Sequence, residues 1–150
     1  MSIIRKSKLI CNVNQLAPDE VRLRFLCQEA SKRADLKKVL ILCSYPAIIA
    51  DYMTKNKINE NNIECRQFGF DFKINPDDYS KFLFIDLAID QYSADILRKI
   101  MDILHLISRY NFNVEIMVSS NVKLKALMME FMDLSRLFNV NYYATEHFKL

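Results

Sequence analysis

Asp86 and Asp90 follow the apolar run FLFI and are the side chains of this sequence best placed for metal-dependent chemistry. Two carboxylates that converge at the end of a strand can hold Mg²⁺ for phosphodiester hydrolysis or phosphoryl transfer. In the other interpretation Asp86 hydrogen-bonds to the loop that follows it and Asp90 is solvated, because such carboxylates are often structural. No third acid nearby completes a convincing site, so the pair predicts either an Mg²⁺ enzyme or a protein without a cofactor.

Polar side chains also follow other apolar runs of the chain. If those runs are parallel strands, their carboxyl ends meet at one edge of the sheet, where doubly wound folds bind their ligands. The candidates for lining a ligand cleft at that edge are Asn12, Ser44, Tyr45, Ser119 and Asn121.

The scarcity of glycine excludes most sites that bind a nucleotide or activate a nucleophile through a tight loop. Gly69 is the only glycine in 150 residues. Phosphate loops, dinucleotide fingerprints and nucleophile elbows need several glycines, because their backbone takes positive φ angles or closely approaches a ligand. The sequence therefore favours a protein that is not an enzyme.

The segment KFLFIDLAID, residues 81–90, resembles the Walker B strand of P-loop NTPases, whose aspartate supports Mg²⁺. VEIMVSSN, residues 114–121, similarly resembles the strand that carries a polar sensor residue in those proteins. The chain departs from that family in CNVNQLAPDE, residues 11–20, which has no glycines or Lys-Ser/Thr pair to cradle phosphates, and in Leu87, where such ATPases commonly have an acid. The resemblance implies a degenerate P-loop-like topology without ATPase activity. A receiver-like fold would have the same order of elements.

Apolar periodicity divides the chain into alternating strands and helices. The runs VLILC and FLFI are unbroken, which is typical of strands covered on both faces. On the first helix, Arg22 falls outside the apolar face that contains Leu23 and Leu26. Asn111 and Asn139 stand where left-handed residues would end two helices. We expect strands over residues 8–13, 39–43, 63–72, 82–85, 114–118 and 140–148, and helices from 18, from 46, over 93–110 and over 122–137.

This alternation predicts a three-layer α/β/α fold with a mostly parallel, doubly wound sheet of about five or six strands. The length of 150 residues and the hydrophobic fraction of 51% suit one domain with its own core. We therefore expect residues 1–150 to form a single α/β domain.

The two C-terminal helices carry apolar residues over a wider arc than a one-sided helix needs. Methionine-rich faces adapt well to other surfaces, so these helices are candidates for binding another protein or a second copy of this chain. The alternative is that both helices simply cover the sheet. The predicted interaction surface contains Ile96, Met101, Leu106, Met128, Met129 and Met132.

A nucleic-acid site is a further alternative. Arg66 and Lys73 flank a segment with alternating aromatic residues, among them Phe68 and Phe70. Exposed rings interleaved with cationic groups can hold a single strand by stacking and phosphate contact. Aromatic residues on one strand face are more often part of a core, and the acidic residues of the same region oppose phosphate binding.

Charge and cysteine usage bear on the compartment. The formal net charge is +3, too small by itself to imply a polyanionic partner. Arg5 and Lys6 interrupt the N-terminal apolar stretch, and no apolar run is long enough to cross a bilayer. The cysteines lack the paired spacing of zinc sites, so we expect buried thiols and a cytoplasmic protein.

These observations lead to one functional prediction and two alternatives. The sequence favours a non-catalytic interaction or regulatory protein, a silent relative of a nucleotide-binding α/β fold in a replication, packaging or regulatory assembly. The abundance of Ile, Asn and Lys suggests an AT-rich genome such as that of a phage or virus. The alternatives are the Mg²⁺-dependent enzyme and the nucleic-acid-binding module.

Overall fold

The computed structural model of the protein describes residues 6–59, 61–68, 82–109 and 114–145. Its centre is a six-stranded sheet with the strand order β3-β2-β4-β5-β1-β6, in which every neighbouring pair is parallel. The strands are β1 (Ser7–Asn14), β2 (Val39–Cys43), β3 (Ile63–Gln67), β4 (Phe82–Leu87), β5 (Glu115–Ser120) and β6 (Phe138–Thr145).

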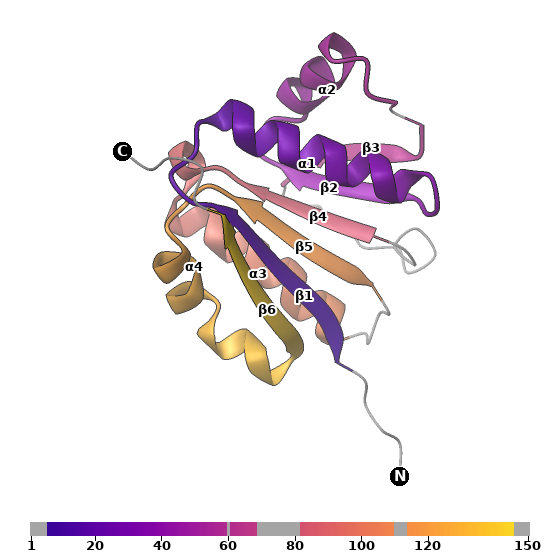
Figure 1. Ribbon diagram of the computed structural model, residues 1–150. Helices are drawn as coiled ribbons and strands as arrows, with labels where there is room; N and C mark the ends of the chain where they lie inside the picture. The colour runs from indigo at the N-terminus through magenta and orange to yellow at the C-terminus, as the bar shows by residue number, and fades with distance from the viewer. Residues whose placement is uncertain (1–5, 60, 69–81, 110–113, 146–150) are drawn as a thin grey trace.

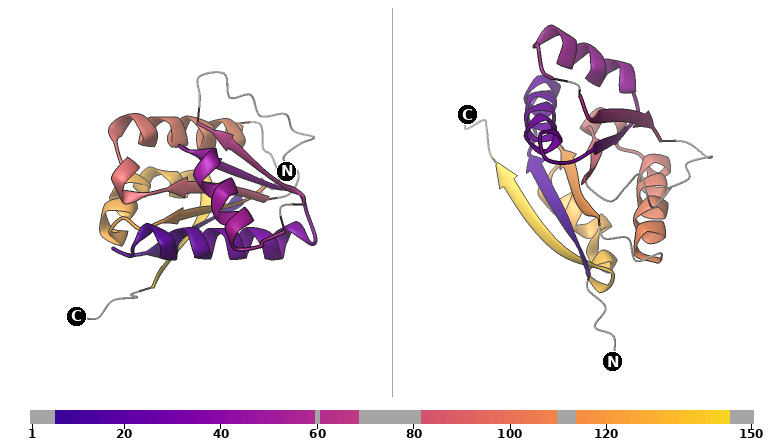
Figure 2. Two further views of the ribbon diagram at one scale, coloured as in Figure 1. Left: turned by 90° about the horizontal axis from the view of Figure 1, so that it is seen from above. Right: turned by 90° about the vertical axis from the view of Figure 1, so that its right-hand side faces the viewer.

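Helices cover both faces of the sheet, so the predicted three-layer, doubly wound α/β fold is confirmed (Figures 1 and 2). The helices are α1 (Asp19–Ala34), α2 (Pro46–Lys55), α3 (Ala94–Arg109) and α4 (Leu124–Glu130), with 3-10 helices η1 (Ile89–Gln91) and η2 (Met132–Arg136). One core cluster contains the buried residues of α1 and α2, and the other contains those of α3, α4 and η2. Within the described ranges, no helix has the length and apolarity needed to cross a bilayer.

The unbroken apolar runs form the middle of the sheet, as predicted. Every residue of β2 and β4 is buried. Successive side chains of a strand point to opposite faces, so Ile41 and Phe84 join the core under α1 while Leu42 and Ile85 join the core under α3. Strands that serve two cores need apolar residues at every position, which explains the absence of alternation.

The last predicted helix is wrong in one respect, because it is divided at Phe131. The backbone there takes φ −99° and ψ 10°, and η2 replaces the continued α-helix. Phe131 and Leu134 are both fully buried, and Leu134 N–H donates to the Phe131 carbonyl. The tighter three-residue spacing of a 3-10 turn brings both side chains into the same core.

The left-handed positions also differ from the prediction. Asn139 lies inside β6, so it does not end a helix, and Asn111 lies outside the described residues. Positive φ angles instead occur at Leu16 (57°), Lys57 (55°) and Asn62 (65°). Asn62 is an asparagine but directly precedes β3, so it does not end a helix as expected, and a left-handed leucine is unusual because of its Cβ.

Candidate functional site

The carboxyl ends of the strands form an open crevice between β2 and β4. The chain leaves β2 toward α2 on one face of the sheet and leaves β4 toward α3 on the other face (Figure 2). Such a divergence opens the space in which doubly wound folds bind ligands. The cleft has a volume of about 120 Å³ and is lined by Asp19, Arg22, Leu23, Tyr45, Ile48, Ile49, Asp86, Asp90 and Gln91.

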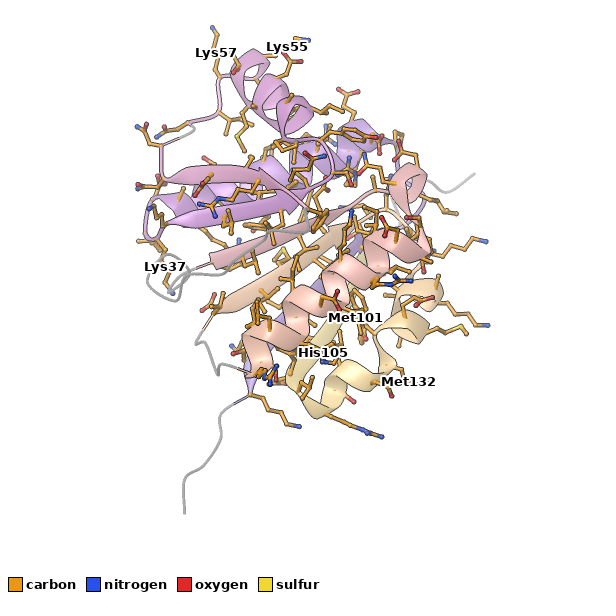
Figure 3. All side chains as sticks on the ribbon, turned by 180° about the vertical axis from the view of Figure 1, so that it is seen from behind. Lys37, Lys55, Lys57, Met101, His105 and Met132 are labelled. Carbon is orange, nitrogen blue, oxygen red and sulfur yellow. The ribbon has the colours of Figure 1, made fainter. Side chains whose placement is uncertain are left out.

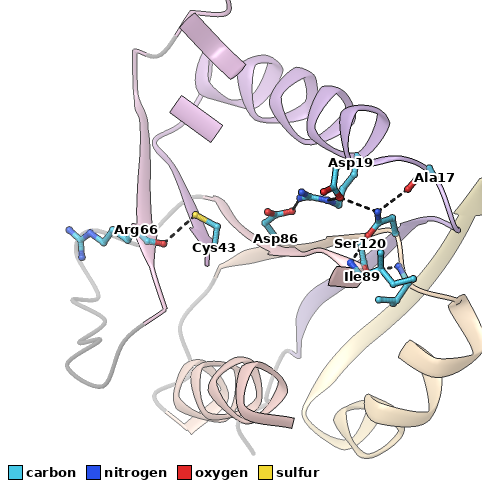
Figure 4. A network of polar contacts seen from close by, with 10 residues as sticks. Ala17, Asp19, Cys43, Arg66, Asp86, Ile89 and Ser120 are labelled. Carbon is cyan, nitrogen blue, oxygen red and sulfur yellow. Dashed lines mark hydrogen bonds and ion pairs between the residues drawn. The ribbon is translucent and has the colours of Figure 1, made fainter. Parts of the chain in front are cut away.

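A buried ion pair lies in the wall of this cleft. Arg22 Nη1 of α1 donates to Asp86 Oδ1 at the end of β4, and the two side chains are only 3% and 4% exposed (Figure 4). Arg22 Nε also lies 3.4 Å from Asp19 Oδ1. The prediction that Arg22 lies on the outer face of its helix was therefore wrong. A charge can be buried here because two carboxylates compensate it.

The electrostatics of Asp86 follow from this burial. Loss of hydration raises the pKa of the Asp86 carboxyl, whereas the Arg22 guanidinium opposes that rise by charge and by hydrogen bonding. The nearby carboxylates of Asp19 and Asp90 add to the upward shift. Asp86 thus already has a cationic partner supplied by the chain itself.

In the predicted metal pair, Asp86 is therefore already paired with a cation of the chain itself. Asp86 and Asp90 do line the same cleft, as the sequence predicted. However, no group of three or more His, Cys, Asp or Glu side chains within the described part of the chain is arranged to hold a metal ion. A divalent cation would have to displace Arg22 from Asp86, and we therefore do not propose the Mg²⁺ enzyme.

The side chain of Asn121, directly after β5, bridges the neighbouring connections. Its Nδ2 donates to the Ala17 carbonyl at 2.9 Å and approaches Asp19 Oδ1 at 3.3 Å, and its Oδ1 accepts from Ile89 N–H at 2.7 Å (Figure 4). This amide joins the β1–α1, β4–α3 and β5–α4 connections. The Asn121 side chain is therefore engaged in contacts within the molecule, and its part in a ligand cleft stays a prediction.

The connection between β1 and α1 is closed where a phosphate loop would present its amides. Leu16 N–H donates to the Asn121 carbonyl and Ala17 N–H donates to the Asn14 carbonyl, each at 3.0 Å. The next residue is Pro18, which has no N–H to offer. A cleft of about 120 Å³ is also well below the roughly 300–1,000 Å³ of typical small-molecule sites.

The other predicted cleft residues lie at the same edge but in different surroundings. Asp86, Ser119 and Asn12 are neighbours across β4, β5 and β1. Ser119 Oγ and Asn12 Oδ1 are buried and have no hydrogen-bond partner among the described residues. Tyr45 is exposed at the cleft mouth, and Ser44 lines an adjoining pocket of about 250 Å³.

The residues of the nucleic-acid prediction do not form an exposed platform in the part of the chain that is described. Phe68 is buried in the core that contains α3. Arg66 Nε donates to Glu64 Oε1 at 2.6 Å on β3, which is an edge strand of the sheet. Phe70 and Lys73 lie outside the described residues.

The predicted interaction surface divides into two parts. Met128, Met129 and Met132 are between 44% and 69% exposed. The α3 members are half-buried, and two of them, Ile96 and Met101, pack against the core. Met101 and Met132 lie on the same face of the molecule (Figure 3). The exposed part of this surface therefore belongs to α4 and η2.

Together the sheet and its strand-end edge define a three-layer parallel α/β protein whose ligand crevices are partly closed by its own side chains. No family model matches the chain, and no curated protein is similar to it. Among solved structures, the chain is similar to a chain in the crystal structure of Rif2 in complex with the C-terminal domain of Rap1, at 9% identity and a TM-score of 0.44. The similarity covers 99% of this chain and 49% of that one, so the chain spans about half of that protein.

Sequence reasoning missed Arg22, although a signal for it existed. Arg22 precedes Leu26 and Ala30 at four-residue spacing, which puts all three on one helical row. A single arginine on an apolar row, facing strands of which one ends in aspartate, predicts a buried ion pair. The exposed apolar residues Leu16 and Ile89, at the same edge of the sheet, lie outside the strands and α-helices and had no such periodic signal.

Proposed function

We propose that the protein is a non-catalytic interaction domain that binds another protein through the methionine face, defined as Met128, Met129 and Met132. The exposure of these three side chains, from 44% to 69%, is the observation that carries the proposal. Large apolar side chains that gather on a surface typically mark an interaction site. Methionine suits this role because its unbranched, polarizable side chain adapts to the shape of a partner.

The local structure of α4 and η2 supports this role. Leu127, Phe131 and Leu134 are fully buried and anchor the segment to the core, so the methionines between them are left on the outside. The half-buried Met101 on α3 continues the apolar surface on the same side of the molecule (Figure 3). A rigid support with an adaptable outer layer is the arrangement that a protein partner requires.

The strand-end edge supports the non-catalytic part of the proposal. In a silent relative of a nucleotide-binding fold, the metal-binding aspartate and the phosphate-binding amides would be used for internal contacts. Asp86 is paired with Arg22, and the Leu16 and Ala17 amides donate to main-chain carbonyls. A role in a replication, packaging or regulatory assembly stays a prediction from the sequence.

A cytoplasmic location is part of the proposal. Cys11, Cys27 and Cys43 are buried thiols, and burial raises the pKa of each to about 12. Thiols without disulfides are typical of reducing compartments.

The test compares a triple variant, Met128→Gln, Met129→Gln and Met132→Gln, with the wild-type chain. Glutamine keeps the length and helix propensity of methionine but removes the apolar surface. The matched control is Leu36→Gln, because Leu36 is 86% exposed in the connection between α1 and β2. Cross-linking and affinity capture from the source cells identify the partner, and titration then measures its affinity for each variant.

We expect the triple variant to bind the partner at least about tenfold more weakly, while the Leu36 variant binds like the wild type. Sedimentation at micromolar concentration decides whether the partner is a second copy of this chain. Equal affinity of the triple variant and the wild type for the captured partner would refute the proposal that the methionine face binds it.

A further inference from the structure

We propose that the cleft between β2 and β4 is a second binding site for a protein partner. It receives an arginine side chain that is flanked by apolar residues in the partner's sequence. This site lies at the carboxyl edge of the sheet and goes beyond the methionine face. The apolar residues near the cleft, the charges inside it and its size favour an arginine as the occupant.

Four exposed apolar side chains, here called the apolar rim, lie at the carboxyl edge of the sheet where the cleft opens. Leu16, Tyr45, Ile48 and Ile89 are each about half exposed, between 46% and 56%. Tyr45 and Ile48 line the cleft itself. The backbone N–H groups of Leu16 and Ile89 both donate to Asn121, which places these two residues near one another at the same edge of the sheet. Large apolar side chains from the β1–α1 connection, from α2 and from η1 thus gather at one edge, as at a protein contact.

The charge inside the cleft is negative, although the whole chain carries +3. Asp19, Asp86 and Asp90 contribute carboxylates, and Arg22 is the cation that lines the cleft with them. Arg22 is already engaged by Asp19 and Asp86. Asp90 is exposed and forms no ion pair within the described part of the chain, so it is available to a cation from outside.

The cleft offers hydrogen-bond acceptors that the described part of the chain itself leaves unused. Gln91 Oε1 is buried at the cleft wall without a partner among the described residues, beside the carboxylate of Asp90. A guanidinium offers five N–H donors in a planar fork, whereas an ammonium offers a compact point charge. A volume of about 120 Å³ suits the end of one side chain. Arginine is therefore the occupant that the cleft fits best.

The backbone of Leu16 supports a role for this rim. Its φ of 57° is unfavourable for a residue with a Cβ, and its side chain is exposed. A left-handed, exposed leucine gains little inside this molecule, so its conformation suggests a contact made to something else. The apolar rim also explains why a protein segment is proposed here and a free cation is not.

The experiment titrates the ¹⁵N-labelled full chain with acetyl-Leu-Arg-Phe-amide and follows the amide signals of Ile48 and Gln91. The control peptide contains citrulline, which keeps the shape of arginine without its charge. We expect the arginine peptide to saturate these shifts, and the citrulline peptide to bind at least about tenfold more weakly.

Matched variants locate the site. Asp90→Asn removes the available carboxylate and should weaken binding about tenfold, whereas Asp133→Asn, an exposed aspartate of η2, should leave it unchanged. Leu16→Asn should weaken binding without lowering the melting temperature, because asparagine tolerates a positive φ. The triple methionine variant should bind the peptide like the wild type. The peptide titration therefore tests the cleft independently of the proposal that the methionine face binds a partner.

Equal affinity for the arginine and citrulline peptides, or no shift of Ile48 and Gln91, would overturn the proposal. Equal affinity of free arginine amide and the tripeptide would also overturn it, because the apolar rim would then contribute nothing to recognition.

Discussion

The ion pair between Arg22 and Asp86 is where a single substitution should have the largest effect on stability. Arg22→Ala leaves a buried carboxylate without its cation, and removal of one partner from such a pair typically costs about 3–5 kcal/mol. We expect a loss of that order in the free energy of unfolding at pH 8, measured by urea denaturation. A double variant, Arg22→Met with Asp86→Leu, should recover most of the loss.

The same variant should respond to pH in a defined direction. Burial raises the pKa of Asp86, and without Arg22 nothing of comparable strength opposes the rise. The folded state then binds a proton that the unfolded state releases, so the stability of Arg22→Ala increases as the pH falls from 8 to 5. If Arg22→Ala lowers the free energy of unfolding by less than about 1 kcal/mol at every pH, the ion pair contributes little to stability.

The buried thiols predict the behaviour of the protein in alkali. The pKa values of Cys11, Cys27 and Cys43 rise from 9.0 to about 12 in the folded state because of burial. Above pH 9 the unfolded chain loses these protons while the folded chain keeps them, so stability declines between pH 9 and 12. Each thiol contributes roughly 1.4 kcal/mol per pH unit to this decline.

Urea denaturation at several pH values measures that slope. Cys11→Ala should give a shallower pH dependence than the wild type, with a slope reduced by roughly 1.4 kcal/mol per pH unit. A stability that is independent of pH above 9 would show that the thiols titrate equally in both states.

At the scale of the elements, α4 and η2 combine an anchor with an exposed layer. Phe131 is fully buried at the break between them, so Phe131→Ala should destabilise the protein by about 3–5 kcal/mol. Met129→Gln changes an exposed side chain and should alter stability by no more than about 0.5 kcal/mol. Thermal or chemical denaturation of the two variants separates the roles, and similar losses for both would contradict this division.

For the whole molecule, the closed strand-end edge predicts no response to nucleotides. A ligand that binds the folded state raises the melting temperature. The cleft at that edge is open, but Asp86 is paired with Arg22 and the Leu16 and Ala17 amides donate to carbonyls, so Mg²⁺ with ATP should leave the melting temperature unchanged. A saturable shift that disappears in Asp86→Asn would instead support metal and nucleotide binding.

The regular elements were the most predictable part of the fold. β2 has the bounds predicted for it, because a run of five apolar residues needs cover on both faces wherever it lies. The break at Phe131 was not predictable from helical periodicity, because it depends on where the core places Phe131 and Leu134. Similarly, Leu16 and Ile89 lie outside the strands and α-helices, where no periodicity marked them, and Ile48 lies on α2 outside the buried positions of that helix.

The sequence by itself determined the succession of strands and helices, because the hydrophobic pattern of each segment reports the surface that it must bury. It also determined the absence of a phosphate loop, since that loop needs glycines that the chain lacks. Only the tertiary structure decided that Asp86 meets Arg22, which lies 64 residues earlier. That contact depends on the strand order, and strand order follows from the packing of both helical layers on the sheet, which no local pattern contains.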